Sequence, residues 1–129
     1  MHEKTLVIEL EVGDRAGEGI AYGNLGNAYG SLGQFHKAME MHEKCLVIAL
    51  EVGNRAGEGM AYSNLGYAYD GLGQFHKAIE MHEKHLAIAL EVGDREGEGI
   101  AYHNLGILYE AAGQPDKAQE MRQAASRLA

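Results

Sequence analysis

The sequence is poor in cysteine, proline, tryptophan and basic residues, and each shortage excludes or disfavours a class of protein. Its one cysteine, Cys45, cannot form an internal disulfide, so the chain is not a secreted disulfide scaffold and a reducing, cytoplasmic environment is expected. Eleven Lys and Arg stand against nineteen Asp and Glu, giving a formal net charge of -8. Nucleic acid is therefore disfavoured as a partner, because phosphate recognition needs clustered cations.

Long apolar runs are also missing. No segment approaches the roughly 18 consecutive apolar residues of a membrane span, and the opening Met-His-Glu-Lys has neither the basic nor the apolar part of a signal peptide. Neither a membrane nor an export route is expected. The 129 residues have room for a single domain, spanning 1–129.

Glycine, in contrast, is abundant, and it follows a repeat of forty residues. Residues 1–40, 41–80 and 81–120 align without gaps and begin MHEKTLVIELEVG, MHEKCLVIALEVG and MHEKHLAIALEVG. With 46% hydrophobic residues the chain is too apolar to be disordered. A fixed period of this length indicates a stacked array, in which each unit buries its apolar face against its neighbours.

Each repeat predicts two helices. The segments 34–52 and 74–92 contain no glycine and have apolar residues at helical spacing. Gly53 and Gly93 follow, where a helix end favours a left-handed residue, and Asn54 and Asp94 then suit helix N-caps. The stretch 20–33 has the same period, and its internal Gly26, repeated at 66 and 106, suggests close backbone approach between paired helices.

The predicted fold is therefore an all-α solenoid of about seven antiparallel helices. Residues 1–13 are expected to form an orphan second helix that ends near residue 12. Three hairpins follow, as repeat 1 (14–53), repeat 2 (54–93) and repeat 3 (94–129). The last is expected to end in a polar cap, since Pro115 and Gln119 replace Phe75 and Ile79.

The first-helix residues Tyr22, Leu25-Gly26 and Tyr29 resemble the tetratricopeptide repeat (TPR) pattern. The forty-residue period is similar to the Leu-Gly-Asn repeats of Pins-type adaptors and, more loosely, to kinesin light chains, and the tripeptide Leu25-Gly26-Asn27 is present literally. The resemblance implies a right-handed superhelix. Its first helices would line a concave groove that holds a peptide or helix of a partner protein.

Positions that differ between the three copies share one face of the first helix, which we interpret as the concave face; drift on an exposed surface is the alternative. This face is apolar with an acidic edge, which favours a peptide with apolar anchors and basic character. An invariant asparagine precedes each Leu-Gly. The resemblance implies that it bonds a ligand backbone, and the alternative is a bond to its own or a neighbouring helix. The candidate groove residues are Ile20, Asn24, Asn27, Met60, Ser63, Asn64, Tyr67, Asp70, Ile100, His103, Asn104, Ile107 and Glu110.

Other chemistry is weakly supported. His82 and His85 lie one turn apart, as do His42 and Cys45, but a firm zinc site needs three or four ligands. No glycine-rich phosphate loop follows a predicted strand, and no Ser/His/Asp grouping stands apart from the repeat. Neither a catalytic site, a metal nor a cofactor is expected. The main hypothesis is a non-enzymatic adaptor; the alternative is a self-associating module, such as a homodimer formed through the open N-terminal helix or the groove.

Overall fold

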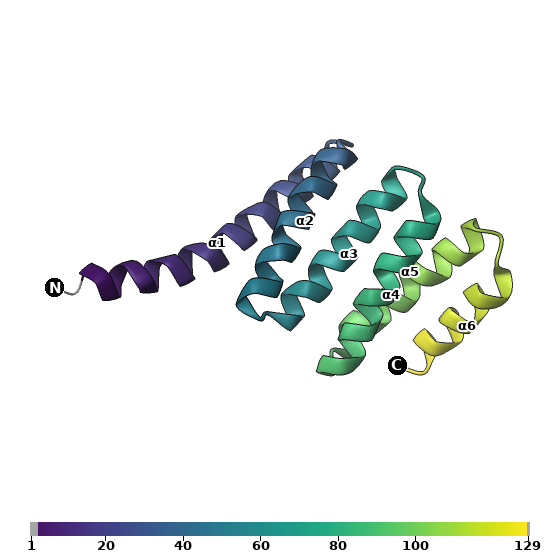
Figure 1. Ribbon diagram of the computed structural model, residues 1–129. Helices are drawn as coiled ribbons and strands as arrows, with labels where there is room; N and C mark the ends of the chain where they lie inside the picture. The colour runs from purple at the N-terminus through teal and green to yellow at the C-terminus, as the bar shows by residue number, and fades with distance from the viewer. Residues whose placement is uncertain (1–2, 129) are drawn as a thin grey trace.

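The computed structural model contains six helices that follow one another as antiparallel hairpins (Figure 1). It describes the backbone of residues 3–128 and the side chains of residues 14–128. Consecutive helices pack against each other, and residues 3–128 contain no strand, so the predicted all-α class is confirmed. The helices are α1 (Glu3–Ser31), α2 (Phe35–Val52), α3 (Arg55–Gly71), α4 (Phe75–Val92), α5 (Arg95–Ala111) and α6 (Pro115–Ser126).

The turns between hairpins form for the reasons that the sequence predicts. Gly53 and Gly93 adopt left-handed φ angles of 71° and 72°, which glycine tolerates without steric cost. Directly after them, the side chains of Asn54 and Asp94 each accept a hydrogen bond of 2.9 Å from the backbone N–H three residues on. These caps satisfy backbone donors that α3 and α5 leave unpaired at their starts.

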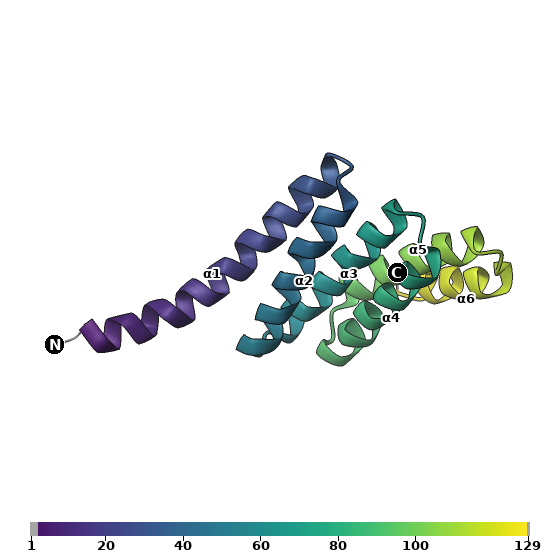
Figure 2. The same cartoon turned by 45° about the horizontal axis from the view of Figure 1, so that its top comes forward.

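The first helix differs from the prediction. The expected helix end near residue 12 is wrong: α1 continues through Gly13 to Ser31, so six helices are described and not seven. Figures 1 and 2 show its N-terminal part extending away from the stacked hairpins. A continuous helix keeps the backbone hydrogen bonds that a left-handed cap gives up. At Gly53 and Gly93, packing between the helices on either side of the turn compensates for the lost hydrogen bonds. The two halves of the continuous helix α1 cannot pack on each other.

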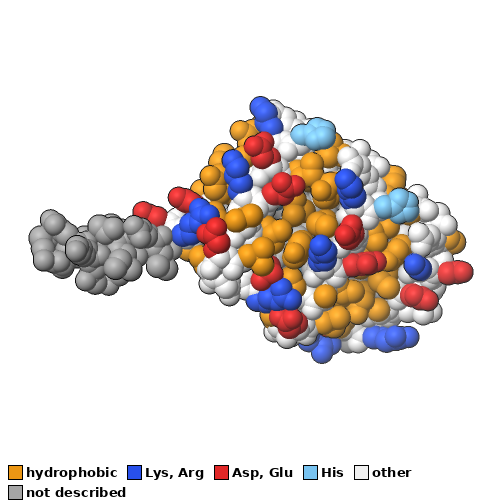
Figure 3. Space-filling model, in the orientation of Figure 1, with side chains coloured by type: hydrophobic (Ala, Val, Ile, Leu, Met, Phe, Trp, Pro, Cys, Tyr) orange, Lys and Arg blue, Asp and Glu red, His pale blue; other side chains and the backbone are white. Residues whose placement is uncertain are grey.

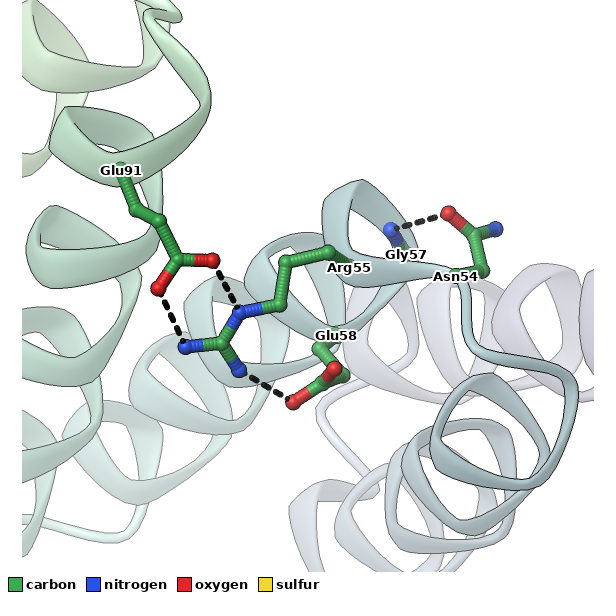
Figure 4. A network of polar contacts seen from close by, with 5 residues as sticks. All are labelled: Asn54, Arg55, Gly57, Glu58 and Glu91. Carbon is green, nitrogen blue, oxygen red and sulfur yellow. Dashed lines mark hydrogen bonds and ion pairs between the residues drawn. The ribbon is translucent and has the colours of Figure 1, made fainter.

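In each of repeats 1 and 2, an arginine–glutamate ion pair joins the first helix to the second. The Arg55 guanidinium donates to both carboxylate oxygens of Glu91, at 2.7 and 3.1 Å, and to Glu58 at 2.7 Å (Figure 4). Arg15 contacts Glu51 in the same way, at 2.6 and 2.9 Å. These bonds lower the pKa of both Glu51 and Glu91. Because the pairs are exposed to solvent, each contributes little to stability and mainly aligns the two helices of its hairpin.

Both helices of a repeat contribute alanines and larger side chains to the interior. Its main cluster joins Ala78 and Ile79 of α4, Leu105, Leu108 and Tyr109 of α5, and Ala118 of α6. The predicted close backbone approach is wrong in two repeats: Gly66 faces the buried imidazole of His82, and Gly26 faces that of His42. The contact is with a ring and not with another backbone.

Candidate peptide-binding groove

A groove runs between α1 and α3, with α2 at its base. A cavity of about 400 Å³ is bordered by Asn27 and Tyr67 and reaches down to Ala38 and His42 of α2. A second cavity, of about 280 Å³, lies between Ile20 and Met60 above Cys45 and Ile48. Asn27 and Asn64 line both cavities, so the two form one continuous depression.

Exposed apolar side chains occupy equivalent positions along the first helices. Ile20 and Met60 are 68% and 67% exposed, and Ile100 holds the same place on α5. Tyr67 and Ile107 are exposed two turns further along α3 and α5. Large apolar side chains left in water at matching positions of successive repeats mark a binding surface more specifically than scattered ones do. We call these five residues the apolar rows.

The three invariant asparagines differ in their surroundings. Asn24 is exposed and Asn64 is half-buried, and both line the 280 Å³ cavity. On α5, the Asn104 Nδ2 group donates a hydrogen bond of 2.9 Å to the Tyr67 hydroxyl on α3. Asn104 therefore contacts a neighbouring helix, as the alternative interpretation expects, while Asn24 and Asn64 border the cavity.

The other predicted residues divide between the rim and the interior. Asp70, His103 and Glu110 are exposed, and Glu110 lies 3.6 Å from Arg122. Ser63 is buried and lines neither cavity, so its hydroxyl is not presented to a ligand there. The candidate positions contain no lysine or arginine, and the two carboxylates make this part of the rim acidic.

The buried histidines fill packing positions of the repeat, and two of them also support the groove. His42 lies at the base of the larger cavity, and the His82 ring packs edge-on against Tyr67, with centroids 5.2 Å apart. Burial lowers the pKa of His42, His82 and His85, that of His82 to about 4. Burial also raises the pKa of the Cys45 thiol, which makes it a poor nucleophile.

Outside the groove, a cavity of about 430 Å³ lies between α1 and α2, and Tyr22, Lys44 and Val47 are among the residues that line it. Among the described residues, no three His, Cys, Asp or Glu side chains are placed to hold a metal ion. The face shown in Figure 3 mixes acidic, basic and histidine side chains over hydrophobic ones. Lysines also cover tyrosine rings: Lys44 and Lys84 lie 5.3 Å from the ring centroids of Tyr22 and Tyr62. These tyrosines are thereby used within their own hairpins.

The comparison with protein families agrees with this arrangement. The sequence model of the tetratricopeptide repeat family matches residues 18–91 and again residues 57–129. The chain belongs to the tetratricopeptide repeat family. Such repeats are typically non-catalytic and generally act as protein–protein interaction modules. In the described part of this TPR protein no helix is both long and apolar enough to cross a membrane.

Solved structures of TPR proteins share the fold. The TPR domain of Arabidopsis FLU superposes with a TM-score of 0.84 at 23% identity, covering 88% of this chain and 97% of that one. BtubC (BKLC) from P. vanneervenii gives a TM-score of 0.83 at 27% identity, covering 98% of this chain and 53% of that one. The chain thus spans about half the length of BtubC. No curated protein matches the sequence, and the finer likeness to Leu-Gly-Asn repeats remains a hypothesis.

Proposed function

We propose that this TPR protein is an adaptor that binds a peptide or helix of a partner protein in the groove between α1, α3 and α5. One observation carries the proposal: the apolar rows are exposed on successive first helices, beside a depression that Asn24 and Asn64 also line. Folding leaves these apolar side chains in water, and a partner's side chains would remove them from it.

The groove chemistry defines the ligand. Apolar anchors of the peptide would contact Ile20, Met60 and Tyr67, because these side chains border the two cavities. The Asn64 amide can both donate to and accept from a peptide backbone, and it lies where the cavities meet. Asp70 and Glu110 on the rim favour Lys or Arg next to the anchors. The preferred sequence is therefore an apolar segment flanked by basic residues.

A random peptide library tests the proposal, because the selection requires no identified partner. We expect the purified chain to select apolar peptides with flanking basic residues from a displayed library. Affinity for a selected synthetic peptide is then measured by fluorescence anisotropy. Met60→Ala and Asn64→Ala should each weaken binding by about tenfold, as central interface residues do.

Leu90→Ala is the matched control. Leu90 is as exposed as the apolar rows but lies on α4 and lines neither groove cavity. It should leave the affinity for the selected peptide unchanged. Equal affinities for wild type, Met60→Ala and Asn64→Ala would show that the groove is not the binding site.

A further inference from the structure

Tyr67 of α3 makes two contacts that hold its side chain against its own repeat and the next one. Its ring packs edge-on against the buried imidazole of His82, with centroids 5.2 Å apart. Its hydroxyl accepts a hydrogen bond of 2.9 Å from the Nδ2 group of Asn104 on α5. The tyrosine therefore has an aromatic contact on α4 and a polar contact on the first helix of the following repeat.

Repeat 1 contains the counterparts of both partners but lacks the tyrosine. His42 on α2 corresponds to the histidine that Tyr67 contacts, and Asn64 on α3 corresponds to the asparagine that bonds its hydroxyl. At the matching position of α1 stands Asn27, which has no ring. The cavity of about 400 Å³ lies at this place, and Asn27, His42 and Asn64 all line it.

This cavity has the size and the lining for one aromatic side chain. Its volume of about 400 Å³ lies within the range of roughly 300–1,000 Å³ of pockets that hold small molecules. Ala38 and Ala68 give it apolar walls. At its base, the His42 ring lies against Gly26, just as the His82 ring lies against the matching glycine of α3. The two imidazoles therefore occupy equivalent places in their repeats.

We propose that the cavity takes a tyrosine side chain of the bound peptide, an inference that rests on the proposed function of the groove. The ring packs against His42 as Tyr67 packs against His82. The hydroxyl accepts a hydrogen bond from the Nδ2 group of Asn64, whose Oδ1 atom can still accept one from the peptide backbone. Tyrosine suits this place because its ring is apolar, while its hydroxyl needs a partner when it is buried.

Other side chains fit the cavity less well. Phenylalanine would cover the amide of Asn64 without giving its N–H group an acceptor, which is unfavourable in a buried place. Lysine or arginine would lose water without gaining a counter-charge, because none of the residues that line the cavity carries a carboxylate. The basic residues of the peptide therefore stay at the rim, where Asp70 is exposed.

Asn27→Tyr tests the fit of the cavity without any peptide, because it copies the residue of repeat 2. The introduced ring should reach His42, and its hydroxyl should reach the amide of Asn64. The urea midpoint of Asn27→Tyr should therefore exceed that of Asn27→Phe, and adding Asn64→Ala to both should remove the difference. Equal midpoints for Asn27→Tyr and Asn27→Phe would overturn the proposal.

Peptides selected by the purified chain from the displayed library test the tyrosine itself. We expect a tyrosine at one constant place in them. In fluorescence anisotropy, replacing it with phenylalanine should weaken binding by about tenfold, and replacing it with alanine by at least about thirtyfold. Asn64→Ala should bind the tyrosine and phenylalanine peptides equally.

Filling the cavity should also exclude the peptide. Asn27→Tyr should weaken binding of the tyrosine peptide by at least about tenfold. Leu90→Tyr is the matched control, because it adds the same ring at an exposed site on α4 that lines neither groove cavity. It should bind as wild type does, and circular dichroism verifies that both variants keep their helices. Equal affinities for Asn27→Tyr and Leu90→Tyr would overturn the proposal.

Met60→Ala separates this proposal from that of the groove. Of the two cavities, Met60 lines only the smaller one. Met60→Ala should therefore weaken the tyrosine and phenylalanine peptides by the same factor. Peptides that depend on Met60 but contain no tyrosine, or that keep their preference for tyrosine in Asn64→Ala, would overturn the tyrosine pocket alone. An affinity that no groove substitution changes would refute the groove and the pocket together.

Discussion

Replacing Gly66 with alanine tests whether the buried ring of His82 needs a glycine on α3. A Cβ at position 66 would lie 2.5–2.7 Å from three atoms of that ring. The ring has little room to move, because His82 is 1% exposed and packs edge-on against Tyr67. The matched control is Gly106 of α5, where a Cβ would lie at an ordinary contact distance of 3.6–3.8 Å from its neighbours.

The two substitutions should change the free energy of unfolding in opposite directions. Both gain about 1 kcal/mol of helix propensity, since glycine is that much less favourable than alanine inside a helix. At Gly106 this gain is the main effect, so Gly106→Ala should stabilise by up to about 1 kcal/mol. At Gly66 the overpacking typically costs about 1–3 kcal/mol. The overlap between the new Cβ and the His82 ring places this cost near the upper end of the range. After the gain in helix propensity is subtracted, the net loss is about 1–2 kcal/mol.

Urea denaturation followed by circular dichroism measures both changes at neutral pH. The midpoint of Gly66→Ala should fall and that of Gly106→Ala should rise, with similar dependence on urea for both. Adding His82→Ala to Gly66→Ala should recover part of the loss, so the two changes should be non-additive by about 1 kcal/mol or more. A urea midpoint of Gly66→Ala equal to or above that of Gly106→Ala would show that the His82 ring does not need a glycine on α3.

Three further predictions concern the buried His82, the helix cap at Asn54 and the Arg55–Glu91 ion pair. His82 has a pKa of about 4 in the folded chain against 6.5 for an exposed histidine, so the unfolded chain binds the proton more readily between these values. The resulting stability is present above pH 6.5 and is lost as the pH falls towards 4, by up to about 3 kcal/mol. Urea titrations at several pH values should show this fall in the free energy of unfolding, and His82→Leu should make the fall smaller. Asn54→Ala should cost about 1 kcal/mol by removing the bond to the Gly57 N–H, and a calorimetric melting temperature equal to that of wild type would contradict it. Arg55→Lys loses the two-point contact with Glu91 and should lower the melting temperature slightly, a difference that added salt should diminish.

Most of the helical organisation could be predicted because the chain contains three copies of one unit. Comparing the copies separates packing positions from variable ones, and the cap residues Asn54 and Asp94 mark where helices begin. Local sequence did not predict the course of the chain at Gly13. Glycine permits both a helix end and a continued helix, and packing of the neighbouring helices decides between them.

The sequence predicted several residues that lie around the cavities, but not which candidates are buried or bonded to a neighbouring helix. Variation among the copies identified Ile20, Met60 and Tyr67, which the structure places around the two cavities. It also selected Ser63, which is buried, because a variable position can lie at the edge of a helix face as well as at its centre. The hydrogen bond between Asn104 and Tyr67 depends on the separation of two helices, which periodicity does not encode.

That same hydrogen bond makes the contact between α3 and α5 stiffer than the contact between α1 and α3. Tyr67 supplies a hydroxyl that ties α3 to α5, whereas α1 has Asn27 at the matching position, and no bond from it to Asn64 is found among the described side chains. Spreading α3 from α5 must break a bond that contributes about 1 kcal/mol, while spreading α1 from α3 does not. The angle between α1 and α3 should therefore change more easily than the angle between α3 and α5.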